Sequence, residues 1–198
     1  RGQMVFVSQR ELSDVFIRAL RRAEFPILYS SGFTPHPRVA FGPALQVGVI
    51  GEREYVDVLL SKMPDEGMIA KLREELPSGM EIRAYKDVPV RSPALSALVS
   101  WALYLFRGEI KGVERLKAKQ GLFVKRKSGK EVDIGRFIGD VEEKEDGVLV
   151  WVRFTQDGSA RPFDIANFIA PGNNNEIEIV RKGLFWEKDG KKRTPMEV

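Results

Sequence analysis

The chain has 198 residues, of which 43% are hydrophobic and 10% aromatic, and its 32 basic and 28 acidic residues give a net charge of +4. Such a length and composition suit one large globular domain or two of about 100 residues each. The absence of cysteine excludes disulfides, thiolate zinc sites and iron–sulfur ligation, and the single histidine excludes a histidine-rich metal site, so we expect no cofactor and no bound metal.

The first half of the chain predicts the order strand, helix, strand, strand, helix, strand. Met4–Val7 has the composition of a strand end. Ser8 and Glu11 have the spacing of a capping box, and apolar residues then recur at helical spacing as far as Ala23. The further elements predicted here are a short extra strand at 25–29, strands at 38–49 and 54–60, a helix at 64–76 and a strand at 80–85.

The second half predicts the same order with additions. Residues 86–93 contain two prolines and no periodicity, so we place a linker at 87–96 between modules at 1–86 and 97–198. The expected fold is α+β, with two ferredoxin-like (βαββαβ) modules in tandem, the second one elaborated. The elements predicted after the linker are strands at 98–107 and 121–126, a helix at 110–120, a strand or helical turn at 131–138, a hairpin at 140–155 around Asp146–Gly147, a helix at 162–170, one or two strands at 176–187 and a turn at Asp189–Gly190.

The segment 29–41 is the first candidate site. It places the only histidine, His36, between Pro35 and Pro37, which stiffen the backbone on both sides. His36 is a candidate phosphate donor or general acid–base, because its charge changes near neutral pH; alternatively, it bonds a backbone carbonyl in a Pro-x-Pro turn. The other candidates are Ser30, Ser31, Thr34 and Arg38 as phosphate donors and Tyr29 and Phe33 as stacking surfaces for an unpaired base.

The predicted first helix carries a basic side. Residues 1–50 contain six arginines and no lysine against three acidic residues, and three of these arginines, Arg18, Arg21 and Arg22, lie in this helix. Arginine favours bidentate recognition of phosphate or carboxylate. The alternative is a solvated helix face.

Two candidate sites lie in the second half. Ser159 and Arg161 precede the helix predicted at Pro162, where free amides and a cation suit an anion; the alternative is a helix-capping turn. The span 111–130 holds eight basic residues and one acidic residue, and we expect it to contact nucleic acid unless it is a solvated face. Its central candidates are Lys125, Arg126 and Lys127.

The sequence around the first site resembles a specific family. The run from Tyr29 to Leu45, Val47-Gly48 and the stretch 54–57 are similar to the radical-SAM-linked proteins, a bacterial domain of unknown function encoded beside or fused to radical SAM enzymes. Phe6-Val-Ser8, the stretch 18–23 and Gly158–Pro162 extend the resemblance over nearly the whole chain. Two positions differ, since Arg10 stands where a histidine is expected and Thr34 where asparagine is usual. The resemblance implies a radical SAM partner and work related to RNA or the ribosome.

These observations favour an accessory protein without catalysis of its own, which binds tRNA or rRNA and acts with a radical SAM enzyme. One alternative is an enzyme whose His36 and Arg161 bind a phosphate or carboxylate substrate between the modules. Another is a protein–protein docking domain for the radical SAM enzyme. No apolar run approaches the ~20 residues of a membrane span, and no charged-then-apolar leader opens the sequence, so we expect a cytoplasmic location.

Overall fold

The computed structural model of the chain describes residues 2–126, 129 and 131–198. The chain divides into two compact units, and it passes between them more than once. Unit 1 comprises Arg1–Gly48, Tyr55–Leu98 and Met196–Val198, and unit 2 comprises Val49–Glu54 and Val99–Pro195. These units differ from the modules predicted at 1–86 and 97–198, because residues 49–54 belong to unit 2 and residues 196–198 to unit 1.

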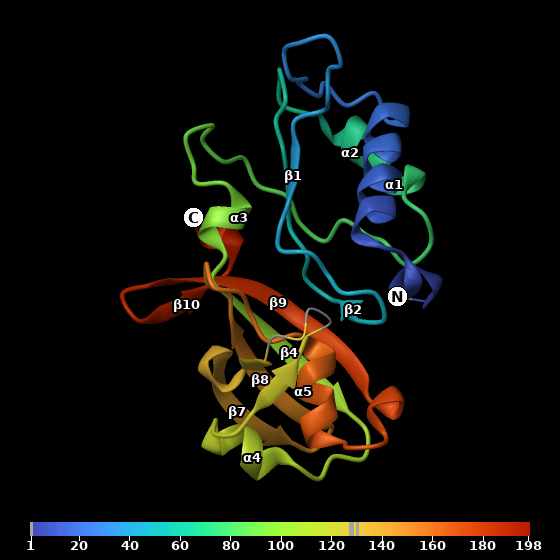
Figure 1. Cartoon of the computed structure of the whole chain (residues 1–198). Coiled ribbons are helices and arrows are strands. Elements are labelled where there is room, and N and C mark those ends of the chain that lie inside the picture. The colour runs from blue at the N-terminus through green and yellow to red at the C-terminus, as the bar shows by residue number, and fades with distance from the viewer. Residues whose placement is uncertain (1, 127–128, 130) are drawn as a thin grey trace. The chain divides into compact units, whose positions relative to one another are not determined.

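Unit 1 is built on one long helix (Figure 1). Ser8 caps it: the Glu11 amide donates to Ser8 Oγ, and the Ser8 amide donates to the Glu11 carboxylate, so the predicted capping box is confirmed. Two short strands pair antiparallel, with Val39 opposite Val58. The elements of this unit are a 3-10 helix at Gly2–Phe6, α1 (Gln9–Arg22), β1 (Val39–Phe41), β3 (Val56–Val58), α2 (Glu66–Glu75) and α3 (Leu95–Leu98).

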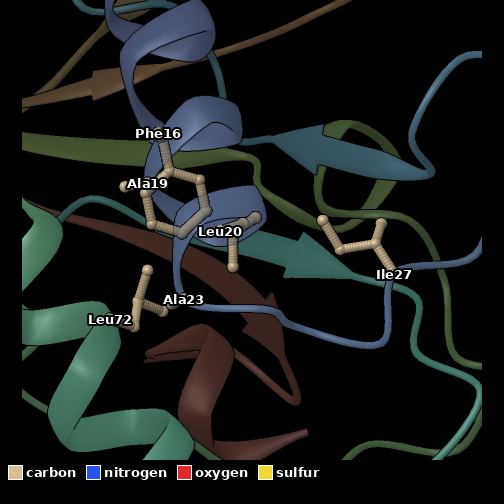
Figure 2. Close-up of a cluster of buried hydrophobic side chains, with 6 residues drawn as sticks. All are labelled: Phe16, Ala19, Leu20, Ala23, Ile27 and Leu72. Atoms are coloured by element: carbon tan, nitrogen blue, oxygen red, sulfur yellow. The ribbon is translucent and has the colours of Figure 1, made fainter.

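The core of unit 1 gathers on the apolar side of α1. Phe16, Ala19 and Leu20 project from this helix toward Ile27, and Leu72 of α2 joins them (Figure 2). These α1 positions recur three or four residues apart, which places them on one side of a helix. Partly buried residues of β1 and β3 complete the cluster, so this side of α1 is fixed and its other side faces solvent.

Two strands predicted for unit 1 are wrong. Met4–Val7 lies in the 3-10 helix and the turn after it, where the Gly48 amide donates to the Val5 carbonyl instead of to a strand ladder. The segment 80–85 has no regular structure, because its alternation reflects packing of Met80 and Ile82 against the core cluster. The mixed α+β class is confirmed for this unit, but the ferredoxin-like order of strands is not.

Unit 2 is an antiparallel sheet with the order β10-β9-β4-β8-β7, and β2 pairs parallel with β9. Apart from β5 and β6, which pair with each other in a separate two-stranded sheet, and two 3-10 helices, the elements β4, α4, β7, β8, α5 and β9 run in the order strand, helix, strand, strand, helix, strand (Figure 1). Its elements are β2 (Ile50–Gly51), β4 (Trp101–Arg107), α4 (Val113–Ala118), β5 (Phe123–Lys125), β6 (Glu131–Asp133), β7 (Ile138–Lys144), β8 (Gly147–Arg153), α5 (Pro162–Ile169), β9 (Glu178–Lys188) and β10 (Lys191–Arg193), with 3-10 helices at Gly135–Phe137 and Asn174–Glu176.

Both predicted hairpins of unit 2 are confirmed. Lys144 pairs with Gly147 across the two-residue turn Glu145–Asp146, so β7 and β8 form the predicted hairpin with its turn one residue before Asp146–Gly147. Lys188 pairs with Lys191, and Asp189 and Gly190 both have positive φ, as a type I′ turn requires. Hairpin registers are set by their own turn residues, which explains why local sequence was sufficient.

The sheet of unit 2 has two different faces. Along β4 and β8 the residues alternate, and Ala102, Val150 and Val152 are fully buried. Alternate residues of a strand point to opposite faces, so these side chains share one face. Helices α4 and α5, which contact each other, bury Leu116 and Ile165 in the same core. The opposite face carries Trp101 and Trp151, which stay partly exposed.

An ion pair with a buried arginine holds the segment 49–54, which contains β2, to the sheet. Arg181 of β9 is 1% exposed, and its guanidinium donates two hydrogen bonds to the Glu54 carboxylate, one of them at 2.9 Å. Tyr104 of β4 also hydrogen-bonds Arg181, and burial raises the pKa of the Tyr104 phenol. Glu52 pairs with Lys182 on the same strand. Charged contacts therefore fix both sides of β9 at this point.

The described part of the chain contains no helix that is both long enough and apolar enough to cross a membrane.

Candidate functional site

The segment 29–41 folds as an ordered hairpin. The Ser30 amide donates to the His36 carbonyl at 2.8 Å, and the His36 amide donates to Ser30 Oγ at 3.0 Å. Tyr29 and Pro37 pair beside them, and the Arg38 amide donates to the Leu28 carbonyl at 2.8 Å. These bonds close the hairpin through the backbone of His36, and its imidazole is exposed. The predicted site residues Ser31, Phe33 and Thr34 lie at the exposed tip, where Phe33 is fully exposed.

The structure brings this hairpin to the basic side of α1. The Arg21 guanidinium lies over the Tyr29 ring, 6.0 Å from its centroid. Arg18 lies three residues earlier, which places it on the same side of the helix, and it is exposed. Arg22 differs, because it pairs with the Glu75 carboxylate of α2 and donates to the Glu75 carbonyl at 3.1 Å. Arg18 and Arg21 therefore remain available to a ligand, whereas Arg22 connects two helices.

Arg38 lies on the other side of the hairpin strand. Its neighbour Val39 packs against the core cluster, whereas Arg38 is exposed. Since successive residues of a strand point to opposite faces, Arg38 points away from that core. Within the residues that the structure describes, no carboxylate lies within ion-pair distance of Arg18, Arg21 or Arg38. The chain has no acidic residue between Glu24 and Glu52, so the hairpin itself carries no carboxylate. On α1, the exposed Asp14 lies four residues before Arg18 and on the same side of the helix.

The second predicted site lies in the turn before α5, where no side chain caps the helix. Ser159 Oγ donates to the Arg153 carbonyl at 3.0 Å, and Arg161 is an exposed residue at the start of α5. Pro162 has no amide hydrogen, and the Asp164 amide already donates to the Arg161 carbonyl. The Asp164 carboxylate also lies in this first turn, where a negative charge interacts favourably with the helix dipole. A carboxylate in the first turn of α5 disfavours an outside anion there, and the anion site at Ser159 and Arg161 stays a prediction.

Three basic residues of the span 111–130, Lys111, Lys117 and Arg126, pair with carboxylates. Arg126 pairs with Asp164 at 2.5 Å, and both side chains are mostly buried. Two carboxylates, Glu114 and Glu143, bind Lys117 and raise its pKa to about 12. Acids therefore balance part of the charge of this span, and its contact with nucleic acid stays a prediction. Of its other candidates, Lys111 pairs with Glu109, Lys125 is exposed, and Lys127 lies outside the described residues.

The hypothesis of a substrate site between the modules stays a prediction. His36 belongs to unit 1 and Arg161 to unit 2. Over residues 2–126, 129 and 131–198, no three acidic or imidazole groups gather as a metal site would require.

The exposed face of the unit 2 sheet was missed in the sequence. Trp101 and Trp151 lie on neighbouring central strands, and the Lys192 ammonium lies 4.7 Å from the centroid of each ring. Phe185 contacts Trp151 edge-on, with ring centroids 4.8 Å apart. The available signal in the sequence was alternation: each tryptophan lies in a predicted strand next to apolar residues that point to the buried face, so the tryptophan points to the other face. Only the strand order and register bring them together.

Together, the fold and these surfaces define a two-unit α+β protein with exposed arginine and aromatic side chains. A family model described as "Uncharacterized protein conserved in bacteria (DUF2344)" matches residues 1–164. The chain therefore belongs to this bacterial family. The match ends within α5, before β9 and β10. Neither the curated proteins nor the solved structures contain a match.

Proposed function

We propose that this protein binds RNA, tRNA or rRNA, through the basic surface of unit 1 and has no catalysis of its own. The observation that carries the proposal is the set of exposed arginines without carboxylate partners beside exposed aromatic rings. We define the arginine–hairpin surface by Arg18, Arg21, Tyr29 and Phe33, together with Arg38 on the opposite face of the hairpin.

The chemistry of this surface suits a nucleic-acid backbone. A guanidinium presents a planar fork of donors that matches phosphate, and a partner carboxylate would otherwise occupy it. Arg22 shows this contrast, because Glu75 already fills its donors. Arg21 stacks on Tyr29, which orients the guanidinium before a ligand arrives. The ordered hairpin holds Phe33 in solvent, where an apolar ring has no structural partner and is available to stack on an unpaired base.

Salt-dependent binding of tRNA and of rRNA fragments tests the proposal. We expect binding at micromolar protein, with affinity falling as salt rises because phosphate contacts release counterions. The variant Arg18→Gln/Arg21→Gln/Arg38→Gln removes three phosphate contacts. It should reduce the slope of log K against log salt by about 2, given roughly 0.7 per contact on single strands.

Arg83→Gln is the matched control. Arg83 belongs to the same unit and is exposed, but it already pairs with Glu81 at 2.6 Å. Its loss changes the net charge by one without removing an available guanidinium, so the RNA affinity should change little. If Arg83→Gln loses as much RNA affinity as each single variant of the arginine–hairpin surface, the proposed site is refuted. The absence of salt-dependent binding to any RNA would refute the proposed function.

The partner and the finer fold remain part of this proposal. The resemblance to radical-SAM-linked proteins supports a radical SAM enzyme as the partner with which the RNA-bound protein acts. We expect such an enzyme to co-purify with the protein as long as the RNA is intact.

The strand order β9-β4-β8-β7, with α4 and α5 as the two crossovers, supports a ferredoxin-like module in unit 2. An experimental structure of unit 2 within the full chain tests that assignment.

A further inference from the structure

The exposed face of the unit 2 sheet carries a layer of aromatic rings. Trp101 of β4 lies opposite Phe185 of β9, and Leu103 lies opposite Trp151 of β8. Residues that pair directly across strands share a face, so all three rings belong to the face that carries Trp101. We call Trp101, Trp151 and Phe185 the aromatic layer.

Glycines let the aromatic layer lie close to the sheet. A Cβ atom at Gly139 of β7 would lie 2.8 Å from a ring atom of Trp101 and 2.9 Å from the Trp151 Cβ. The Trp101 indole therefore reaches from β4 across β8 to β7 and lies along the sheet instead of standing upright on it. A ring that lies flat against a sheet turns one of its faces outward. This is the geometry of a stacking platform.

Charged side chains contact the layer: two cations lie near its rings, and the Glu187 carboxylate accepts a hydrogen bond from Trp101 Nε1 at 2.7 Å. The Lys192 ammonium lies 4.7 Å from both indole centroids, and the Arg153 guanidinium lies 5.6 Å from that of Trp101. Arg153 is exposed and Lys192 is half-buried. Lys192 makes only a long ion pair, 3.8 Å from the Asp140 carboxylate, so it is weakly held. Such a combination of rings and cations differs from a closed apolar core, in which rings are fully buried and have no charged neighbours.

We propose that the aromatic layer is a second binding site, which takes unpaired bases of single-stranded RNA by stacking on Trp101 and Trp151. This inference rests on the proposed function, because it names the form of RNA that the protein binds. Bases stack on indole faces regardless of sequence, and Arg153 and Lys192 lie where the phosphates of the stacked nucleotides would pass.

Lys192 occupies the site until a base arrives. A base that stacks on an indole competes with the half-buried Lys192 ammonium for the same ring faces. The displaced side chain stays on the hairpin of β9 and β10, directly opposite Glu187, and its long stem lets the ammonium turn to a neighbouring phosphate. A duplex offers no free base faces, so the site discriminates single strands from double strands.

The test compares a 12-nucleotide oligoadenylate with a 12-base-pair RNA duplex on the full chain. Trp101→Leu keeps an apolar side chain and removes the ring, and we expect it to weaken oligoadenylate binding about tenfold while duplex binding stays unchanged. Trp101→Phe keeps a ring and should retain most of the affinity. Trp186→Phe is the matched control: it changes the third tryptophan, which lies outside the layer and donates to the Thr194 carbonyl.

Ultraviolet cross-linking of the unaltered protein to oligouridylate gives a readout that does not depend on whether the variants fold. Cross-linked peptides that contain Trp101 or Trp151 support the inference. Cross-links confined to unit 1, or equal binding by Trp101→Leu and the parent, overturn it while the proposed function stands. If the triple arginine variant binds oligoadenylate normally and Trp101→Leu does not, the arginine–hairpin surface is refuted as the binding site and the aromatic layer is supported. Binding of no RNA at all refutes both.

Discussion

Removing the carboxylate of Glu54 should destabilise unit 2 more than removing the arginine that it binds. Glu54 is the more exposed partner, with a side chain 37% exposed, whereas the Arg181 side chain is 1% exposed. In Glu54→Gln the guanidinium remains buried and loses its counter-charge. In Arg181→Met the carboxylate that remains can be hydrated, and the thioether side chain fills part of the vacated space.

The expected loss follows from the cost of an unpaired buried charge. Removal of one partner from a buried pair costs about 3 to 5 kcal/mol of unfolding free energy. Tyr104 still hydrogen-bonds Arg181 and water reaches the Glu54 side, so we expect the lower limit, about 3 kcal/mol. For a protein of this size that lowers the Tm by roughly 6–12 °C. The loss in Arg181→Met should be about half as large, and the double variant should recover stability relative to Glu54→Gln.

Urea and thermal unfolding of the four proteins measure this double-mutant cycle. Glu178→Gln is the control, because Glu178 lies on the same strand and binds Arg107, but both side chains are well exposed and such pairs contribute about 1 kcal/mol or less. A Glu54→Gln loss no larger than this control refutes the reasoning. So does a double variant that is less stable than Glu54→Gln.

Three further predictions concern single positions. Ser8→Ala removes the cap of α1 and should lower the unfolding free energy by about 1 kcal/mol in urea titrations, whereas Ser8→Asp should keep it. Burial raises the pKa of the half-buried Asp57, although a hydrogen bond from the Leu95 amide acts in the opposite direction. The contribution of this carboxyl group to stability is therefore complete below the usual carboxyl pKa and is lost as pH rises through the raised pKa. The Tm of Asp57→Asn relative to the parent should increase between about pH 3 and pH 7, and a constant difference would contradict this. Gly147→Ala places a Cβ atom 2.0 Å from the Phe106 carbonyl oxygen at φ +145°, and we expect loss of the folded sheet by circular dichroism.

Local signals in the sequence predicted local structure well. The capping box at Ser8 and the turn at Asp189–Gly190 depend on residues within four positions of one another, and both are present. The strand predicted at Met4–Val7 is absent because a strand needs a partner, and a carbonyl there accepts from the Gly48 amide instead. Composition describes the preference of a segment, but the pairing is decided elsewhere in the chain.

The candidate sites show the same limit. Arg21 and Tyr29 were separate candidates in the sequence, and the fold brings them together. Nothing in the sequence indicates that Arg22 is paired with Glu75, 53 residues away. Arg126 counted as a free cation until the fold brought Asp164 to it. The aromatic layer is invisible without the strand register, because Trp101 and Trp151 lie 50 residues apart and meet only across two neighbouring strands.

The segment 49–54 gives the protein an unusual order of assembly. Its strand β2 pairs with Val180 and Arg181 of β9, which the ribosome adds about 130 residues later. Until then Glu54 has no buried arginine to bind, and the segment is an unpaired strand between two parts of unit 1. A cut at one position cannot separate the units, since the chain crosses between them before residue 49, after residue 54 and again near residues 98 and 195. Each unit is therefore built from separate segments of the chain, and neither is one contiguous segment that can be expressed alone.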